Sequence, residues 1–452
     1  MSGVPSAPAS RTSQPSKPSK PSKSSTPAKP SKPPAAPGSV GKARAVLTAW
    51  LARPLTSLHL ILGVFGLLTL FGLVMVLSAS AVESYTLDGS SYSVFVRQAL
   101  FCLVGLVFFW LGLRFRPRML RLGSGVLLVG TLVLLVAVLV PGIGTIRNGA
   151  RSWFVLGPLS FQPSELAKVA FAMWGAHLLV TRRAVVHRWR GLAPVVLVGL
   201  GMCTLVVLQP DLGTTIALGI VLLALLFFAG APLRLLASLT LGGLAGAVVL
   251  GLTSGYRQSR ITAFLAGDAA DPLGAAYQAR QALFSLADGG LFGVGLGQGR
   301  AKWSYLPNAH NDFIFAIIGE ELGIIGAFAV LALFGALAYA GLRIAARSTD
   351  PWLKLVVATL TVSLVAQAAI NICYVVGLLP VTGIQLPLVS SGGSSLVITM
   401  FVFGLLANAA RHEPEAVAAV RTHGQGRLAK RLGLRPPQPY RPSRSGGRAV
   451  RR

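Results

Sequence analysis

Long apolar segments follow one another along most of the chain, separated by short polar stretches. A helix needs about 20 apolar residues to cross the hydrocarbon core of a bilayer, and each apolar segment is close to that length. Ten such segments lie at residues 58–80, 96–113, 122–141, 164–181, 191–209, 213–230, 235–253, 313–342, 353–378 and 393–409. The pattern predicts an all-α integral membrane protein with about ten transmembrane helices.

Composition and charge divide the chain into a membrane domain and two basic tails. Hydrophobic residues make up 53% of the chain and charged residues only 12%, about half the charged share of a soluble domain. Much of the net charge of +28 lies at the two ends. We expect disordered cytoplasmic tails at 1–57 and 410–452 around a membrane domain at 58–409. Their charge favours membrane lipids over nucleic acid, which is the minor alternative.

The distribution of basic residues between the loops predicts the orientation in the membrane. Arginine and lysine mark one set of alternate loops, at 114–121, 182–190, 234 and 343–354. The opposite loops contain neither residue, at 81–95, 210–212 and 379–392. Basic loops remain in the cytoplasm, so both termini should lie there and the long loops 142–163 and 254–312 should lie outside. Loop 254–312 is too long for a simple connector, and we expect an ordered cap with interfacial or re-entrant helices near 259–287.

Asp312 is the first candidate for chemistry among the 13 acidic residues. It stands where the polar outer loop becomes an apolar span, with His310 and Phe313 beside it. One interpretation is a helix N-cap, since aspartate is favoured there. The other is a partly desolvated carboxylate of raised basicity, which could take a proton from a hydroxyl group.

The remaining candidates lie near the outer ends of spans. Glu165 and Lys168 are three residues apart on one helical face and could form a structural ion pair. Alternatively, Lys168 and Arg151 could hold a phosphate group. Asp211 lies where two spans meet and could simply start a helix. The six histidines are dispersed, which gives little support to a metal site, although His310 neighbours an outward carboxylate.

Four motifs resemble the SEDS family of shape, elongation, division and sporulation proteins. They are GARSWFVLGPLSFQPSELAK at 149–168, QPDLGT at 209–214, KWSYLPNAHNDFIFAIIGEELG at 302–323 and GLLPVTGIQLPLVSSGGSS at 377–395. They occur in the family's order, and the third motif and the long basic tails resemble the division members most. The chain departs from the common pattern at Asn311, where many relatives have Thr, and at Ser391, where Tyr is common.

The resemblance implies a peptidoglycan glycosyltransferase of the bacterial cell membrane that polymerises lipid II at the division septum. It implies Asp312 as the base that takes the proton of the acceptor sugar's 4-hydroxyl group. Arg97, Arg151, Lys168 and Lys302 are available as cations for the departing pyrophosphate, and a divalent cation such as Mg²⁺ or Mn²⁺ could assist them. We also expect Glu165, Asp211 and His310 to belong to the substrate site.

The resemblance further implies partners, and two other classes of protein stay open. The expected partners are a single-pass class B penicillin-binding protein that acts as transpeptidase, and other divisome proteins. A lipid II flippase would use the same intramembrane charges but would need alternating access, and the sequence shows no clear inverted repeat. A non-catalytic division scaffold would explain the basic tails but not the aspartate at the loop–helix junction.

Overall fold

The computed structural model describes residues 53–147, 149–157, 159–182, 189–253, 275–303, 306 and 309–440, with positions 3 and 264. The prediction for residues 1–57 therefore falls almost entirely outside the described residues, as does the part of the outer loop between 254 and 274 apart from position 264. Residues 51–452 form one compact unit by their internal contacts, and the description below concerns this unit.

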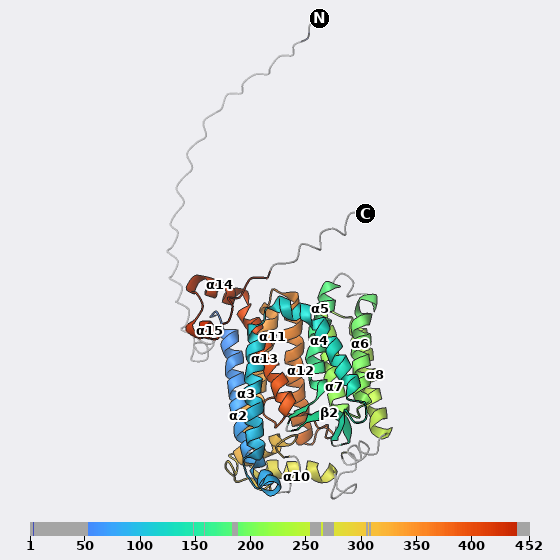
Figure 1. The fold of residues 1–452 in the computed structure, drawn as a ribbon, viewed down its shortest axis with the longest axis vertical. Helices are drawn as coiled ribbons and strands as arrows, with labels where there is room; N and C mark the ends of the chain where they lie inside the picture. Colours follow the sequence, from blue (N-terminus) through green and yellow to red (C-terminus); the bar gives the residue numbers. More distant parts are fainter. Residues whose placement is uncertain are drawn as a thin grey trace, which may run out of the picture. The chain divides into compact units, whose positions relative to one another are not determined.

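The unit is a bundle of long helices with a small sheet at one end (Figure 1). The helices are α2 (Thr56–Asp88), α3 (Ser93–Arg114), α4 (Pro117–Ala137), α5 (Pro163–Thr181), α6 (Trp189–Val207), α7 (Leu212–Ala229), α8 (Leu233–Thr253), α10 (Ala275–Asp288), α11 (Ile314–Arg347), α12 (Pro351–Val375), α13 (Gly393–Arg411), α14 (Pro414–His423) and α15 (Arg427–Arg431). The strands are β1 (Thr145–Arg147), β2 (Ala150–Leu156) and β3 (Leu159–Phe161).

The ten predicted spans coincide with α2 to α8 and α11 to α13. Nine of these helices, within the described residues, are long and apolar enough to cross a membrane. The exception is α5, which carries Glu165 and Lys168 in its first two turns. The prediction of a polytopic helical membrane protein is confirmed, and α5 is a polar helix packed among the apolar ones.

The sheet was not predicted. Its strands are antiparallel in the order β1-β2-β3. Gly149 and Gly157 have positive φ angles of 79° and 59° at the two hairpin turns, a backbone region that suits glycine. The Asn-Gly dipeptide at 148–149 is a strong hairpin signal in sequence and could have revealed this element.

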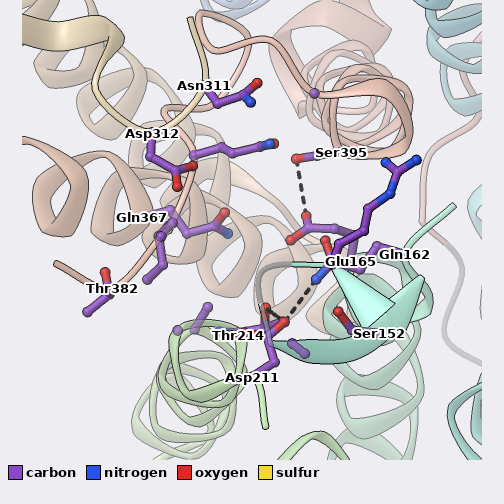
Figure 2. A pocket seen from close by; sticks show the side chains of 18 of the residues that line it. Ser152, Gln162, Glu165, Asp211, Thr214, Asn311, Asp312, Gln367, Thr382 and Ser395 are labelled. Carbon is purple, nitrogen blue, oxygen red and sulfur yellow. Dashed lines mark hydrogen bonds between the residues drawn. The ribbon is translucent and has the colours of Figure 1, made fainter. Parts of the chain in front are cut away.

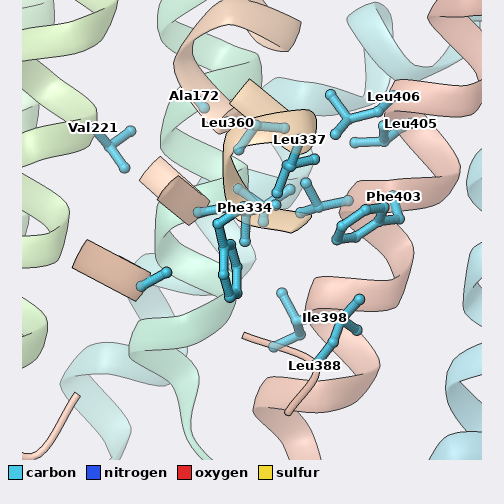
Figure 3. Packing of buried hydrophobic residues seen from close by; sticks show 14 of the residues in the cluster. Ala172, Val221, Phe334, Leu337, Leu360, Leu388, Ile398, Phe403, Leu405 and Leu406 are labelled. Carbon is cyan, nitrogen blue, oxygen red and sulfur yellow. The ribbon is translucent and has the colours of Figure 1, made fainter. Parts of the chain in front are cut away.

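The hydrophobic core lies where α5, α7, α11, α12 and α13 meet (Figure 3). In the most apolar 18-residue stretch of α12, 72% of the residues are buried inside the bundle. In the equivalent stretch of α8, only 6% are buried. Phe334, Leu360 and Phe403 contribute large buried side chains from three of these helices. The fold therefore has a central helix, α12, and a peripheral one, α8, whose side chains are mostly exposed.

Helix α11 is broken at Gly323, which has a φ of 66° and a ψ of −166°. The break exposes backbone groups that would otherwise bond within the helix. The carbonyl oxygens of Glu320 and Glu321 accept hydrogen bonds from the amides of Val294 and Gly295, at 2.9 and 3.0 Å. The outer loop is thereby bonded directly to the helix that follows Asp312.

The end of the bundle opposite the sheet carries the arginine-rich segment 114–121 and an ordered C-terminal segment. Helices α14 and α15 differ from the disorder expected for residues 410–452, of which 441–452 lie outside the described residues. Glu413, which precedes α14, is buried and accepts a hydrogen bond from the Ser57 hydroxyl at 3.1 Å. Burial raises the pKa of Glu413, and the Ser57 hydrogen bond opposes that rise.

Candidate functional site

A cavity of about 740 Å³ opens at the sheet end of the bundle. Figure 2 shows polar side chains from several elements directed into it. The sheet supplies Ser152, α5 supplies Glu165, and the segment before α11 supplies Asp312. Leu244, Ala247 and Val248 of the peripheral helix α8 form an apolar part of the wall. The cavity thus joins a polar interior to a helix that is largely exposed on the side of the bundle.

Asp312 lines this cavity, two residues before the start of α11. Helix α11 begins at Ile314 with Phe313 at the N-cap position, and the Phe313 side chain makes no capping hydrogen bond. Asp312 therefore stands one residue before the N-cap position rather than in it.

Two buried side chains of α12 hold the backbone of Asp312 in place. The side-chain nitrogen Nδ2 of Asn371 lies 2.9 Å from the Asp312 carbonyl oxygen and 2.7 Å from the Ile384 carbonyl oxygen. The Tyr374 hydroxyl lies 2.7 and 2.8 Å from the same two carbonyl oxygens. The Asp312 backbone is thereby tied to the loop that precedes α13. We call Asn371 and Tyr374 the carbonyl clamp.

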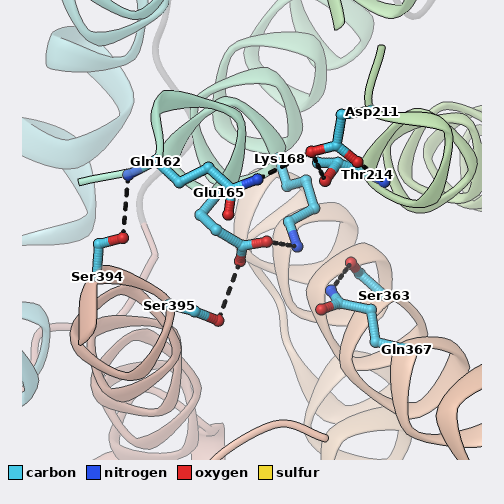
Figure 4. A network of polar contacts seen from close by, with 9 residues as sticks. All are labelled: Gln162, Glu165, Lys168, Asp211, Thr214, Ser363, Gln367, Ser394 and Ser395. Atoms are coloured by element: carbon cyan, nitrogen blue, oxygen red, sulfur yellow. Dashed lines mark hydrogen bonds and ion pairs between the residues drawn. The ribbon is translucent and has the colours of Figure 1, made fainter. Parts of the chain in front are cut away.

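Glu165 and Lys168, which both line the cavity, form a largely buried ion pair (Figure 4). The Lys168 ammonium group donates to Glu165 Oε1 at 2.8 Å, and Ser395 of α13 lies 3.4 Å from Glu165 Oε2. The ion-pair interpretation is thus confirmed. Both residues also line the cavity, so the pair faces whatever occupies it.

Asp211 caps α7 and also lines the cavity. Its carboxylate accepts hydrogen bonds from the Thr214 backbone amide at 3.0 Å and the Thr214 hydroxyl at 2.7 Å. Gln162 donates a third bond at 2.9 Å. The helix-start interpretation is confirmed, and this carboxylate is already well supplied with donors.

His310 faces the cavity and has two polar contacts there. Its Nδ1 atom lies 3.0 Å from Glu83 Oε2 of α2, and its carbonyl oxygen accepts a bond from the Ser391 amide at 2.9 Å. The segment around Ser391 is in turn held by Gln98, whose side chain bonds Ser390 and Gly392. Gln98 was missed because nothing in its local sequence distinguishes a buried amide from a lipid-facing one.

Arg97 and Arg147 are the arginines that line the cavity among the described residues. Arg97 is the predicted cation near the start of α3, whereas Arg147 was not predicted. The Arg147 guanidinium lies over the Trp153 ring, 5.6 Å from its centre. Within the described part of the chain neither arginine has a carboxylate within 4.0 Å. These two charges are therefore available to an anion in the cavity.

The structure places Lys302 and Arg151 outside the cavity lining. The Lys302 ammonium group pairs with Glu321 at 3.0 Å, and both side chains are almost fully buried. The Glu321 carboxylate also accepts a bond from the Ser78 hydroxyl of α2 at 2.6 Å. Arg151 points its guanidinium toward the Leu139 carbonyl oxygen at 3.4 Å.

The carboxylates around the cavity do not form a ready cation site. Glu165 is paired with Lys168, and Asp211 is bonded to Thr214 and Gln162. No group of three or more His, Cys, Asp or Glu side chains suited to a metal occurs within the described residues. Mg²⁺ is often held by one or two carboxylates together with substrate phosphates, so a cation brought with the substrate stays a prediction.

The fold and the cavity define a polytopic membrane protein with a polar chamber beside an apolar wall, suited to a ligand with a charged head and a lipid tail. The family of cell cycle proteins that includes FtsW, RodA and SpoVE matches residues 58–415. The chain belongs to this family, which confirms the resemblance to the shape, elongation, division and sporulation proteins.

Sequence relatives cover most of the chain. The "Probable peptidoglycan glycosyltransferase FtsW" of Mycobacterium tuberculosis is 54% identical over 404 residues, covering 89% of this chain and 77% of the relative. The "Stage V sporulation protein E" of Bacillus subtilis is 41% identical over 360 residues, covering 79% and 98%.

Solved structures show the same fold. The rod shape determining protein RodA of Thermus thermophilus has a TM-score of 0.59 and 29% identity, over 81% of this chain and 99% of that one. A chain from a structure described as "Structural coordination of polymerization and crosslinking by a peptidoglycan synthase complex" has a TM-score of 0.65 and 30% identity, over 80% and 98%.

Proposed function

We propose that this protein is a peptidoglycan glycosyltransferase, which polymerises lipid II into glycan strands on the outer face of the cytoplasmic membrane during cell division. The observation that carries the proposal is the position of Asp312 in the cavity wall, together with Arg97, Arg147 and the apolar surface of α8. The names of the relatives support the same activity.

Asp312 is the proposed general base. The 4-hydroxyl oxygen of the acceptor sugar attacks C1 of the donor sugar, and the Asp312 carboxylate takes the hydroxyl proton. The bond from C1 to the pyrophosphate oxygen breaks, and undecaprenyl pyrophosphate leaves with that electron pair. The carbonyl clamp acts by position, because it fixes the backbone that presents the carboxylate.

The free cations suit the departing pyrophosphate. Arg97 and Arg147 have no carboxylate partner within the described residues and line the cavity, so they can stabilise the negative charge that develops on the leaving group. Lys168 contributes less, since Glu165 already compensates its charge. The apolar stretch of α8 can accept the lipid chain.

A single-pass class B penicillin-binding protein is the proposed partner, and other divisome proteins would assemble around the pair. One structural neighbour comes from a peptidoglycan synthase complex, which supports a transpeptidase partner. The surface proposed for contact includes the outer loop and the exposed side of α11, where Phe292 and Phe328 are 79% and 64% exposed. Polymerisation that is the same with and without the cognate partner, at all partner concentrations, would contradict this contact.

The proposed orientation places the cavity outside and the arginine-rich end in the cytoplasm. A cysteine introduced at Ser90, which is exposed in the loop between α2 and α3 and outside the proposed contact surface, should react with an impermeant maleimide in intact cells. A cysteine at His423 of α14 should react only after permeabilisation. The parent protein, with Cys102, Cys203 and Cys373, supplies the background. The reverse pattern would place the cavity on the wrong side for lipid II polymerisation.

Tyr374→Phe tests the carbonyl clamp. The change removes a hydroxyl group that contacts the carbonyl oxygens of Asp312 and Ile384. Both oxygens keep their hydrogen bonds from the Asn371 side chain. We therefore expect the free energy of unfolding to fall by about 1 kcal/mol. We expect the polymerisation rate to fall by up to about 10²-fold because the base is misplaced. Tyr339→Phe is the matched control, since Tyr339 is 50% exposed on α11. Equal rates for the two variants would show that the clamp has no part in catalysis.

Labelled lipid II in proteoliposomes separates the three classes of function. A glycosyltransferase converts lipid II in the leaflet that faces its cavity into strands. A flippase moves lipid II between leaflets without forming bonds, and a scaffold does neither, with or without a transpeptidase. Bond formation, with the partner present if it is required, supports the proposal, and translocation alone would replace it.

A further inference from the structure

Residues 427–435 of the C-terminal segment pack against the end of the helix bundle through specific contacts. The Trp110 indole nitrogen of α3 donates to the Leu432 carbonyl oxygen at 2.9 Å. The buried Arg411 guanidinium, at the end of α13, donates to the Arg435 carbonyl oxygen at 2.8 Å. Leu434 between them is only 7% exposed and belongs to the hydrophobic core. Figure 1 shows α14 and α15 at the same end of the bundle as the start of α2.

These contacts fix the depth of the segment relative to the membrane. Trp110 lies four residues before the end of α3, an apolar span that ends at Arg114. Its hydrogen bond therefore holds Leu432 level with the last turn of a span, where the hydrocarbon gives way to head groups. Tryptophan is enriched at that level. The Arg114 guanidinium lies over the Trp110 ring, 4.7 Å from its centre.

The segment is positively charged and partly apolar at this level. Its exposed cations are Arg427, Lys430, Arg431 and Arg435, and Arg114 is exposed beside them. No acidic residue occurs between positions 416 and 440. Leu432 and Phe115, which adjoin these cations in the chain, are 39% and 38% exposed. A surface with cations and exposed apolar side chains at head-group depth matches a phospholipid in both charge and polarity.

We propose that Arg114 and residues 427–435, together called the C-terminal platform, bind the phosphodiester head groups of anionic phospholipids in the adjoining leaflet. The depth of the platform favours lipid over an acidic peptide, because a peptide in the aqueous phase would leave Leu432 and Phe115 without an apolar partner. The inference is independent of the proposed catalytic site, which lies at the other end of the bundle.

Hydrogen exchange of the full-length protein in mixed micelles tests the platform. Phosphatidylglycerol, titrated against phosphatidylcholine, should slow exchange in the peptide that covers residues 424–440. Each basic residue near an anionic surface contributes about fivefold in affinity, so Lys430→Gln with Arg431→Gln should raise the half-saturating phosphatidylglycerol content about 25-fold. The control is the double variant Lys354→Gln with Arg234→Gln, which removes the same two charges at exposed residues outside the platform. This variant should change the half-saturating phosphatidylglycerol content by less than about twofold.

Two results would overturn the proposal. One is equal exchange in phosphatidylcholine and phosphatidylglycerol, which would leave the cations available to an acidic protein partner instead. The other is an equal shift for the platform variant and the control, because that would make the effect one of total charge. Both variants change exposed side chains only, and the Leu432 and Arg435 carbonyl bonds remain available in each.

Discussion

Replacing Asp312 by Asn is expected to lower the rate of glycan polymerisation by about 10²-fold or more, because the variant lacks the oxygen that takes the acceptor's proton. The protein should still fold, since the side chain keeps its size and the N-cap position of α11 belongs to Phe313. The carbonyl clamp binds the Asp312 backbone and is unaffected by the change. The measurement is strand formation from labelled lipid II at matched amounts of folded protein.

The control for this substitution is Asp288→Asn, which makes the same chemical change at an exposed residue at the end of α10. We expect that variant to polymerise at nearly the wild-type rate. Near-normal turnover by the Asp312 variant would remove Asp312 from the role of base. Asp211 and Glu165 would then be the next carboxylates to test, although both already have partners in the cavity wall.

Breaking the buried pair between Lys302 and Glu321 should have the largest effect on stability. Replacing Glu321 by Met leaves the Lys302 ammonium group buried without its partner, which should cost about 3–5 kcal/mol. Replacing both residues by Met should restore most of the loss, because no uncompensated charge remains. Reversible unfolding in mixed micelles measures both variants.

The exposed pair between Arg347 and Glu415 provides the comparison. Its atoms lie 2.8 Å apart, but the two side chains are 33% and 51% exposed. Glu415→Gln should cost no more than about 1 kcal/mol. If the Glu321 single variant were no less stable than this one, the pair would not anchor the outer loop to α11.

The membrane helices could be predicted because each span must be apolar over a fixed length, a requirement visible along a single segment. The fourth predicted span shows the limit of that reasoning. Helix α5 carries Glu165 and Lys168, whose spacing suggested an ion pair, but only the fold shows that the pair lies in the wall of the cavity. The sequence likewise suggested that Asp211 starts a helix. The structure shows that Asp211 caps α7 and also lines the cavity.

What could not be predicted depends on contacts between distant residues. Lys302 is an outward lysine in sequence, and its pairing with Glu321 arises because α11 breaks at Gly323 and receives the outer loop. Arg147 reaches the cavity through a hairpin that the apolar pattern does not reveal. The clamp joins Asn371 and Tyr374 to carbonyl groups of two different loops, which no local pattern indicates.

The central claim is that this chain forms glycosidic bonds between lipid II molecules. The most direct measurement incubates the purified protein with labelled lipid II, separates the products by length, and quantifies free undecaprenyl pyrophosphate. We predict a ladder of glycan strands with one undecaprenyl pyrophosphate released for each bond, and formation of both products about 10²-fold slower or more in the Asp312→Asn variant. Intact lipid II with no pyrophosphate carrier released, in the presence of the transpeptidase partner, would contradict the claim.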